Sequence, residues 1–422
     1  MQEAIISAMA SLFEQEFGNF SGHLDTLEPA VSKFMLSLGS GLLQRLIDNG
    51  SKGYQGSSIA CDCGRWQRFV DYRTKSVHTL FGWVLIKRAY YHCDDCGASS
   101  VPYDKASGLG TEQLSAALAK ACCTLAVDDS FEETARKIEA LCGQKVSDNT
   151  IERIVHQVGS AALRTDNDQW DVFMKDRHIP ESQNKPQRLY IAPDGTTVHE
   201  EDGWHEAKIG SIYWENEDFK RHNHYVGRFD DSEVFGNHLW LKACRYGLRD
   251  AVEAVYIGDG AGWIRTIRNA HFRKATFIVD WYHASEHIWD CGKILFGEGT
   301  DSAKRWVERR QSLLWDGWTR KLLNDLKRQQ KKYDGDKREA IDALHRYISV
   351  NEEQMRYDVF RKKGYDIGSG AVEGACKHVV GKRLKQSGMI WTRKGSAAVL
   401  ALRIAWLNRE WAHLWSQKPL AA

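Results

Sequence analysis

The sequence lacks long apolar runs and any marked excess of charge of one sign, and it contains only six prolines. No stretch of about 18 apolar residues is present, so no segment is long enough to cross a membrane as a helix. The first residues include Glu3 and Glu14 and have no basic start, so we expect no signal peptide and a cytoplasmic location. The 58 basic residues are nearly matched by 56 acidic ones, so the net charge of +2 does not by itself indicate a nucleic-acid binder.

The remaining composition is that of a globular protein, with 42% hydrophobic and 27% charged residues and a length that suits two to four domains. Basic residues are concentrated locally. Residues 304–332 contain ten Lys or Arg, three acidic residues and three tryptophans, and a further basic stretch covers residues 356–394. Both stretches fit a nucleic-acid surface, and both also fit ordinary solvated helix faces.

Local patterning divides the chain into five segments. They are an amino-terminal helical region (1–55), a β-rich module (56–104), a second helical region (105–165), a polar linker with two of the six prolines (166–187) and a large domain (188–420).

Four of the ten cysteines bracket the β-rich module: Cys61, Cys63, Cys93 and Cys96. A cytoplasmic location argues against disulfides. Each cysteine pair is followed by glycine and strands join the two pairs, as in a zinc ribbon, where four thiolates hold one structural Zn²⁺. The first pair is C-x-C where a ribbon usually has C-x-x-C, and reduced cysteines without metal are the alternative.

The second helical region predicts a pair of helices joined by a short turn. Gly143 ends the first helix, and Asn149 with Glu152 can form a capping box at the start of the second. The pair resembles a helix-turn-helix whose second helix would read DNA, although any helical hairpin would give a similar pattern.

Five strand-like runs in the large domain predict an α/β fold. The first three follow one another as a meander, and the last two alternate with helices. This order is that of a ribonuclease H-like mixed five-stranded sheet, in which the first and fourth strands are neighbours. Residues 284–365 show no strand pattern and predict a helical insertion.

Three acidic residues stand where this fold would gather them. Asp194 and Asp259 end the first and fourth apolar runs, and Glu373 follows Ser369, which can cap a helix. Carboxylates at this edge of a sheet can hold hard cations, and two Mg²⁺ ions about 4 Å apart activate a hydroxyl and stabilise a leaving 3′-oxygen in phosphoryl transfer. We therefore expect Asp194 and Asp259 within about 4 to 7 Å, with Glu373 approaching from a helix.

The motifs APDGTTV, GDGAGWI, VDWYHASEHI, GYDIGSGAVEGACKHVVGKRLKQSGMIW and AVLALRIAWLN carry a resemblance to a known family. The chain resembles insertion-sequence transposases of the ISKra type, within the Mutator-like DDE group, over nearly its whole length. The resemblance implies an enzyme that binds the terminal inverted repeats of its element and catalyses metal-dependent DNA cleavage and strand transfer. Asp194, Asp259 and Glu373 would be its DDE triad and would hold two Mg²⁺ or Mn²⁺ ions.

The same resemblance implies further site residues and partners. Asp280 and His283 match the D-x-x-H signature that follows the second Asp of the triad. Residues expected to contact DNA or to support the metal ligands are Asp280, Trp281, His283, Lys377, Lys382 and Arg383. The partners would be double-stranded DNA, as transposon ends and as target, and further copies of the chain on that DNA in the bacterial nucleoid. No membrane and no nucleotide cofactor are implied.

Two other functions fit parts of the pattern. A non-catalytic DNA-binding regulator descended from a transposase would need only the amino-terminal modules, and the presence of all three acids argues against it. A ribonuclease H-like, structure-specific nuclease would share the fold and the acids. Joining of a precut end to target DNA would distinguish the transposase from both.

Overall fold

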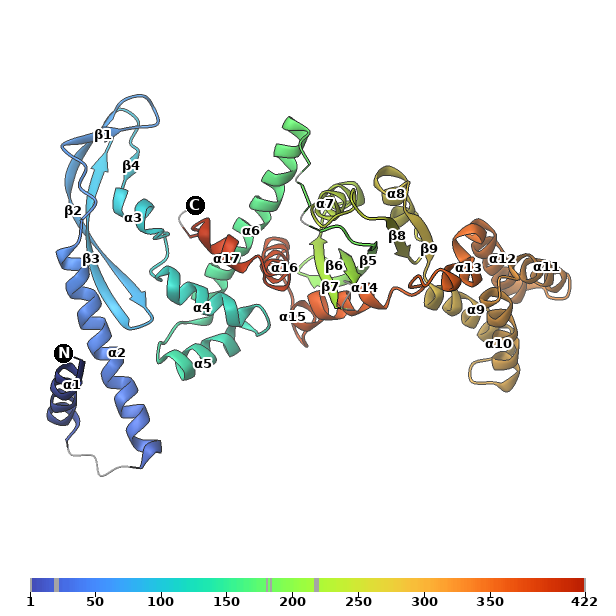
Figure 1. The fold of residues 1–422 in the computed structure, drawn as a ribbon, viewed down its shortest axis with the longest axis horizontal. Coiled ribbons are helices and arrows are strands. Elements are labelled where there is room, and N and C mark those ends of the chain that lie inside the picture. The colour runs from blue at the N-terminus through green and yellow to red at the C-terminus, as the bar shows by residue number, and fades with distance from the viewer. Residues whose placement is uncertain (1, 19–22, 180, 183, 216–219, 421–422) are drawn as a thin grey trace. The chain divides into compact units, whose positions relative to one another are not determined.

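The computed structural model describes residues 2–18, 23–179, 181–182, 184–215 and 220–420, in two compact units (Figure 1). The first unit comprises Met1–Ala162 together with Trp411–Ala422, and the second comprises Leu163–Glu410. The carboxyl-terminal residues therefore belong to the first unit, and not to the large domain 188–420 in which the sequence pattern placed them.

The first unit contains a four-stranded antiparallel sheet built around a long hairpin. Strands β2 (Trp66–Thr79) and β3 (Gly82–His92) pair along their length, and the short strands β1 (Ser58–Ala60) and β4 (Ser99–Ser100) flank them. The hairpin packs its apolar side chains against helix α2 (Leu24–Asn49). A β-rich module was predicted for this segment, and the sheet confirms it.

The other helices of the first unit are α1 (Gln2–Phe17), α3 (Pro102–Ser107), α4 (Ala116–Ala126), α5 (Phe131–Cys142), the start of α6 (Asp148–Asp176) and α17 (Trp411–Ser416). Helices α5 and α6 are the predicted pair with its short connection. Gly143 ends α5 with a φ of 65°, as expected for a glycine stop. The cap of α6 differs from the prediction, because Ser147 Oγ, and not Asn149, accepts the hydrogen bond from Thr150 N at 3.3 Å.

Helix α6 continues into the second unit, so the first half of the predicted linker 166–187 is helical. Its polar residues make specific contacts there. Asp166 accepts a hydrogen bond from Arg228 at 2.8 Å and lies 2.9 Å from His238 Nδ1. The polarity that suggested a linker thus belongs to a helix face that pairs with the buried side chains of Arg228 and His238.

The second unit is built on a mixed five-stranded sheet with the order β7-β6-β5-β8-β9 (Figure 1). The strands are β5 (Arg188–Glu200), β6 (Gly203–Glu215), β7 (Arg221–Arg228), β8 (Glu253–Gly258) and β9 (Thr276–Val279). Strand β6 runs antiparallel to both of its neighbours, whereas β5, β8 and β9 are parallel. The predicted pairing of the first strand with the fourth is confirmed.

Helices follow the strands in alternation and then form an insertion. They are α7 (Ser232–Arg245), α8 (Gly262–His271), α9 (Trp281–Phe296), α10 (Asp301–Trp315), α11 (Thr319–Gln330), α12 (Gly335–Val350), η1 (Glu352–Met355), α13 (Tyr357–Lys362), α14 (Gly370–Ala375), η2 (Cys376–Gly381), α15 (Lys382–Leu384) and α16 (Arg393–Leu407). Helices α9 to α13 confirm the helical insertion expected over 284–365.

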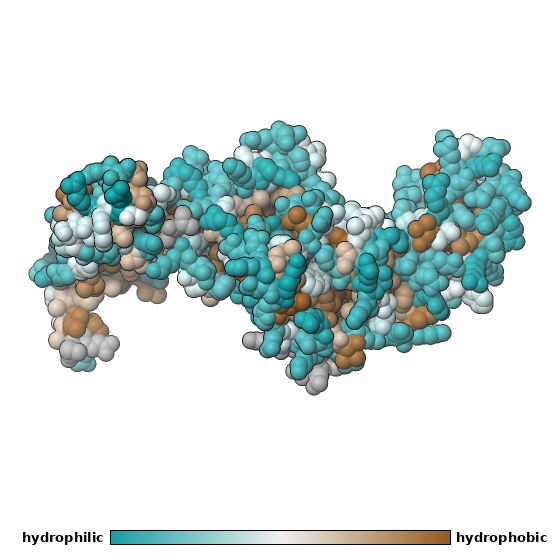
Figure 2. All heavy atoms as spheres, turned by 90° about the horizontal axis from the view of Figure 1, so that it is seen from above, coloured by the Kyte–Doolittle hydropathy of each residue, from teal (hydrophilic) through white to brown (hydrophobic). Residues whose placement is uncertain are grey.

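Figure 2 shows hydrophilic side chains over most of the face in view. Nine of the ten basic residues between 304 and 332 are exposed on this insertion. The tenth, Arg310, is buried, where it lies 2.6 Å from Asp325 and over the ring of Trp306. Among the described residues, no helix is both long enough and apolar enough to span a membrane.

Candidate active site and cysteine centre

Two of the predicted acids lie on neighbouring parallel strands. Strands β5 and β8 pair as far as Ile191 and Tyr256, and the same register continued by three residues sets Asp194 beside Asp259. Asp259 directly follows β8, as predicted. Strand β5, in contrast, runs on past Asp194 to Glu200 while it pairs with β6. Asp194 therefore lies where β5 separates from β8, and not at the tip of its strand.

A third aspartate, Asp280, directly follows strand β9, as Asp259 directly follows β8. Strands β8 and β9 stay paired up to Gly258, so the following position sets Asp280 beside Asp259. Asp280 is fully buried. Its carboxylate accepts a hydrogen bond from His283 N at 2.9 Å, at the start of α9, and another from the backbone N–H of Ser369. Asp280 is thus a buried support for two backbone segments and does not face solvent.

Local backbone N–H groups hold the carboxylates of Asp194 and Asp259. Asp194 Oδ1 accepts a hydrogen bond from Gly195 N at 2.7 Å, and Asp259 Oδ1 accepts one from Ala261 N at 2.7 Å. The Tyr347 hydroxyl, from the helical insertion, donates to the backbone carbonyl of Asp259 at 3.1 Å. The insertion therefore helps to hold the end of β8.

Glu373 comes from α14, which passes into the π-helical turn η2. Ser369 occupies the cap position, as predicted, but its hydroxyl accepts no hydrogen bond from the helix. It donates instead to Glu373 Oε1 at 3.1 Å. The side chain of Glu373 is half-buried, and one of its oxygens is held by the residue one turn before it.

The segment that carries Glu373 is tied to strands on both sides of β8. At its start, the backbone N–H of Ser369 donates to Asp280, after β9. One turn beyond Glu373, Cys376 Sγ donates to Asp194 Oδ2 at 3.4 Å, on β5. Ser369, Glu373 and Cys376 are spaced by four and three residues, and such residues share one face of a helix.

Helix α14, which carries Glu373, packs on β5 and β6. The polar anchors of its segment reach from Asp280, after β9, to Asp194 on β5.

Burial raises the pKa of Asp194 above its ordinary value, and the charge of Asp259 raises it further. Hydrogen bonds from Gly195 N and Cys376, and the charge of His283, act in the opposite direction. Burial likewise raises the pKa of Cys376, which keeps its thiol protonated and able to donate. Residues from β5, α9 and η2, and the residue that follows β8, therefore lie close enough to interact electrostatically.

The three acids are not gathered as tightly as a filled metal site. Within the described ranges, two groups of three or more ligand atoms lie within 4.8 Å of one another, and neither contains the three acids. One group consists of the four cysteines of the first unit. The other consists of Glu200, Asp202 and His205, at the turn between β5 and β6. Glu200 already pairs with Arg393 at 3.2 Å and with Ser396 at 2.6 Å.

The aromatic residues expected near DNA lie differently from one another. Trp281 packs against Trp315 and Tyr357, with ring centroids 4.8 and 5.0 Å away. It therefore contributes to packing between helices. His283 is half-buried, lies 3.2 Å from Glu286 through Nδ1, and acts electrostatically on Asp194. His283 is the one of the two that adjoins the acidic site.

Two of the three basic residues expected beside Glu373 are exposed, and one is buried. Lys377 and Lys382 are exposed on η2 and α15. Arg383 is fully buried, with its guanidinium 5.0 Å from the centre of the Trp391 ring. A surface contact with DNA is therefore open to the two lysines, whereas Arg383 supports the packing of the segment.

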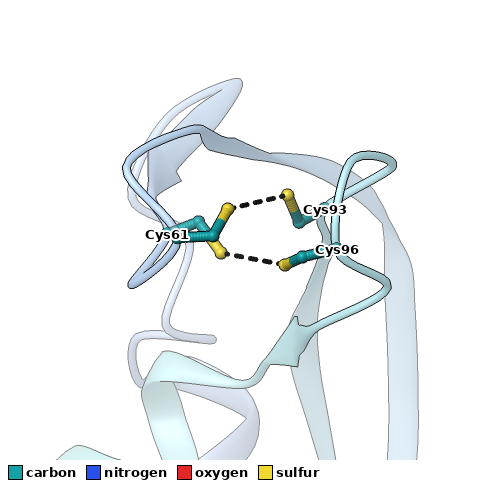
Figure 3. Close-up of side chains that lie close together, drawn as sticks. Cys61, Cys93 and Cys96 are labelled. Atoms are coloured by element: carbon teal, nitrogen blue, oxygen red, sulfur yellow. Dashed lines mark hydrogen bonds between the residues drawn. The ribbon is translucent and has the colours of Figure 1, made fainter.

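The four predicted cysteines converge in the first unit, where two loops bring them face to face (Figure 3). Cys61 Sγ lies 3.6 Å from Cys96 Sγ, and Cys63 Sγ lies 3.8 Å from Cys93 Sγ. A disulfide would require about 2.05 Å. Four sulfurs placed tetrahedrally around zinc at about 2.3 Å would lie about 3.8 Å apart. This set can therefore hold a metal such as zinc.

Both cysteine loops end in a glycine with positive φ, Gly64 at 83° and Gly97 at 74°. The missing residue of the C-x-C pair is accommodated, because Cys61 N and Cys61 O bond to Arg65 O and Gly64 N at 2.9 and 3.0 Å. The backbone N–H of Cys63 lowers the pKa of Cys61 to about 6, with help from the side chain of Gln67. These donors favour the thiolate, which is the form that binds a metal.

The structure thus contains two compact units, a mixed five-stranded sheet with helices, and a set of four cysteines. Residues 25–413 match the Uncharacterised protein family (UPF0236), and the chain belongs to this family. It is similar to a Streptococcus gallolyticus protein described as "UPF0236 protein in vanSb 3'region". The two are 24% identical over 357 residues, which cover 79% of this chain and 73% of that protein.

The sequence pattern does not predict three polar contacts of the site. It indicates Ser369 as a helix cap and assigns no role to Cys376 or Tyr347. The four-residue spacing from Ser369 to Glu373 was a usable signal, because such residues are neighbours on a helix. Nothing local in the sequence indicates the partners of Cys376 and Tyr347, which lie 182 and 88 positions away.

Proposed function

We propose that the chain is a DDE transposase of a prokaryotic insertion sequence, as the resemblance of its motifs to ISKra-type enzymes implies. The observation that carries this proposal is the matched placement of Asp194, Asp259 and Glu373. Two of the acids are register neighbours on parallel strands, and the third comes from a helical segment anchored to Asp280 and to Asp194. The family is commonly linked to transposase-like insertion-sequence proteins, which agrees with the proposal.

The sheet supports the same conclusion. The order β7-β6-β5-β8-β9, with β6 antiparallel to the other strands, is the arrangement expected for a ribonuclease H-like core. In such a core the acids of the first and fourth strands lie together at one edge. A helical insertion between the second and third acids would be the variable part of this fold.

The donor set suits Mg²⁺ or Mn²⁺, which prefer oxygen ligands and keep waters that a phosphate can replace. Bound between these carboxylates, two such ions would activate the attacking hydroxyl and stabilise the leaving 3′-oxygen. Asp194, Asp259 and Glu373 would hold them. Burial and mutual repulsion raise the pKa of Asp194, which is the behaviour expected of an acid that a cation would neutralise.

DNA contacts would come from exposed basic residues. Nine of these lie on α10, α11 and the turns that follow them, and Lys377 and Lys382 lie on the segment that carries Glu373. Phosphate contacts of this kind supply affinity without sequence selectivity. Selective recognition of the terminal repeats would fall to the first unit, with its cysteine centre and the α5–α6 pair.

Strand transfer tests the proposal. The DNA that flanks the coding gene provides a labelled, precut end, which is incubated with the protein, supercoiled plasmid and Mg²⁺ or Mn²⁺. The proposal predicts labelled end joined to plasmid, and no joining by an Asp259→Asn variant. Cleavage of branched DNA without joining would instead indicate a structure-specific nuclease. Binding of the end without cleavage by the wild-type protein would indicate a regulator.

A further inference from the structure

We propose that Asp280, Ser369 and Cys376 form a clamp that positions Glu373 relative to Asp194 and Asp259. This inference rests on the proposed function and identifies three positioning residues for it. None of the three needs to touch DNA or metal. Their role is to set the distance between the acid on the helix and the two acids on the strands.

The β9 end of the clamp is built from buried groups. Asp280 is fully buried and Ser369 is only 3% exposed. One oxygen of Asp280 accepts from the backbone N–H of Ser369, and the other accepts from His283 N at 2.9 Å. The same carboxylate therefore fixes the start of α9 and the start of α14. The Ser369 hydroxyl in turn donates to Glu373 at 3.1 Å. A residue that is held at the end of β9 therefore holds the Glu373 carboxylate.

The β5 end of the clamp is a single thiol. Cys376 Sγ donates to Asp194 Oδ2 at 3.4 Å from the first residue of the π-helical turn η2. A π-helical turn is less stable than α-helix and persists where the surroundings hold it. Cys376 thus connects the carboxyl-terminal end of the Glu373 segment directly to one of the predicted metal ligands.

Such a clamp would counter the electrostatic repulsion among the three carboxylates. Three carboxylates that converge without a cation repel one another, so a free Glu373 would turn away from Asp194 and Asp259. Anchors on both sides hold the helix in place before a metal arrives. Residues that orient metal ligands in this way typically change metal affinity by about 10- to 100-fold when they are removed.

Mn²⁺ titration of the full-length protein, followed by calorimetry and by cleavage of the labelled end, tests the clamp. Ser369→Ala should raise the Mn²⁺ concentration needed for half-saturation about tenfold. End binding should be retained, and Ser369→Thr should restore Mn²⁺ affinity. Cys376→Ala should act in the same direction, whereas Cys376→Ser keeps a donor. Ser396→Ala is the matched control, because Ser396 is also a buried serine that donates to a carboxylate, that of Glu200, elsewhere in the same unit.

Amide hydrogen exchange of residues 369–376 provides a readout that needs no activity. Asp280→Asn should increase exchange in this segment about tenfold or more, because the carboxylate that holds its start is lost. Wild-type Mn²⁺ affinity and unchanged exchange in the variants would overturn the clamp and leave the transposase proposal standing. Absence of Mn²⁺ binding that depends on Asp194 in the wild-type protein would overturn both.

Discussion

The cysteine set and the acidic set differ in how closely the structure gathers their possible ligand atoms. The four sulfurs already lie within 4.8 Å of one another, at the separations that zinc requires. The three acids are placed by strand register and by helix anchors, and they are not gathered to that extent among the residues that the structure describes.

The chemistry of the ligands explains this difference. The pKa of Cys61 is lowered, whereas those of Cys63 and Cys96 are raised, so these two thiols stay uncharged and the sulfurs can approach closely without an ion. Carboxylates are ionised at neutral pH and repel one another, so they converge fully only when a cation neutralises them. A closed sulfur site suits a structural ion, whereas an open oxygen site suits catalysis, because a substrate phosphate must reach the ion.

Removal of one sulfur should have the largest effect on the protein. Cys93→Ser is expected to lose the zinc and to unfold the β1–β4 sheet, since structural zinc in small domains supplies about 10 kcal/mol or more. Elemental analysis should give one zinc per wild-type chain and almost none for the variant. Cys142→Ser is the control, because Cys142 lies outside the set. Far less than one zinc per chain in the wild-type protein would contradict the assignment of the four cysteines as a zinc site.

Removal of one acid should leave the fold intact and abolish activity. Asp194→Asn, Asp259→Asn and Glu373→Gln should each reduce cleavage and joining about a thousandfold, because a lost ligand forfeits several kcal/mol of transition-state stabilisation. End binding and zinc content should not change. Asp202→Asn tests the neighbouring acidic group and should retain activity. Near-wild-type cleavage by any one of the three variants would exclude that residue as a metal ligand.

The smallest effect concerns stability without metal. Because the folded-state pKa of Asp194 is raised by burial, the folded protein binds its proton more tightly than the unfolded chain does. This contribution favours the fold at low pH and is lost as the pH rises through the folded pKa. Asp194→Asn should therefore raise the neutral-pH free energy of unfolding of the metal-free second unit, by about 1 kcal/mol at most.

Asp202→Asn is a matched variant, for which the pKa shift of the carboxyl group has the opposite sign. His205 lowers the pKa of Asp202, so that carboxylate favours the fold above its unfolded pKa, and the contribution is lost as the pH falls through the folded pKa. Asp202→Asn should leave stability at neutral pH unchanged or slightly lower. Urea unfolding at pH 7 and at pH 4 compares the two variants. A loss of stability for Asp194→Asn at pH 7 would contradict the assigned pKa direction.

The strand order of the second unit could be predicted because each strand is a short apolar run with a clear end. The pairing of the first and fourth strands followed from the order of the runs, three as a meander and two alternating with helices, which is that of a ribonuclease H-like sheet. The continuation of β5 past Asp194 could not be predicted in this way. Residues 194 and 195 are Asp-Gly, a pair typical of a turn, and the pairing of residues 195–200 with β6 continues the strand past it.

The linker prediction failed for a related reason. Seven of the eleven residues at 166–176 are polar, a composition that resembles a linker, although Trp170, Phe173 and Met174 recur at helical spacing. Their partners, Arg228 and His238, come from β7 and α7 and are not visible in the local pattern. The cysteine set, in contrast, was found from sequence alone, because its ligands are rare residue types at short spacing.

Anomalous diffraction from crystals grown with Mn²⁺ tests the central claim most directly. We expect anomalous peaks between Asp194, Asp259 and Glu373, where β5 separates from β8, with none at the zinc-filled cysteine centre at an energy between the manganese and zinc edges. Manganese bound at Glu200, Asp202 and His205, with the predicted position empty, would contradict the account.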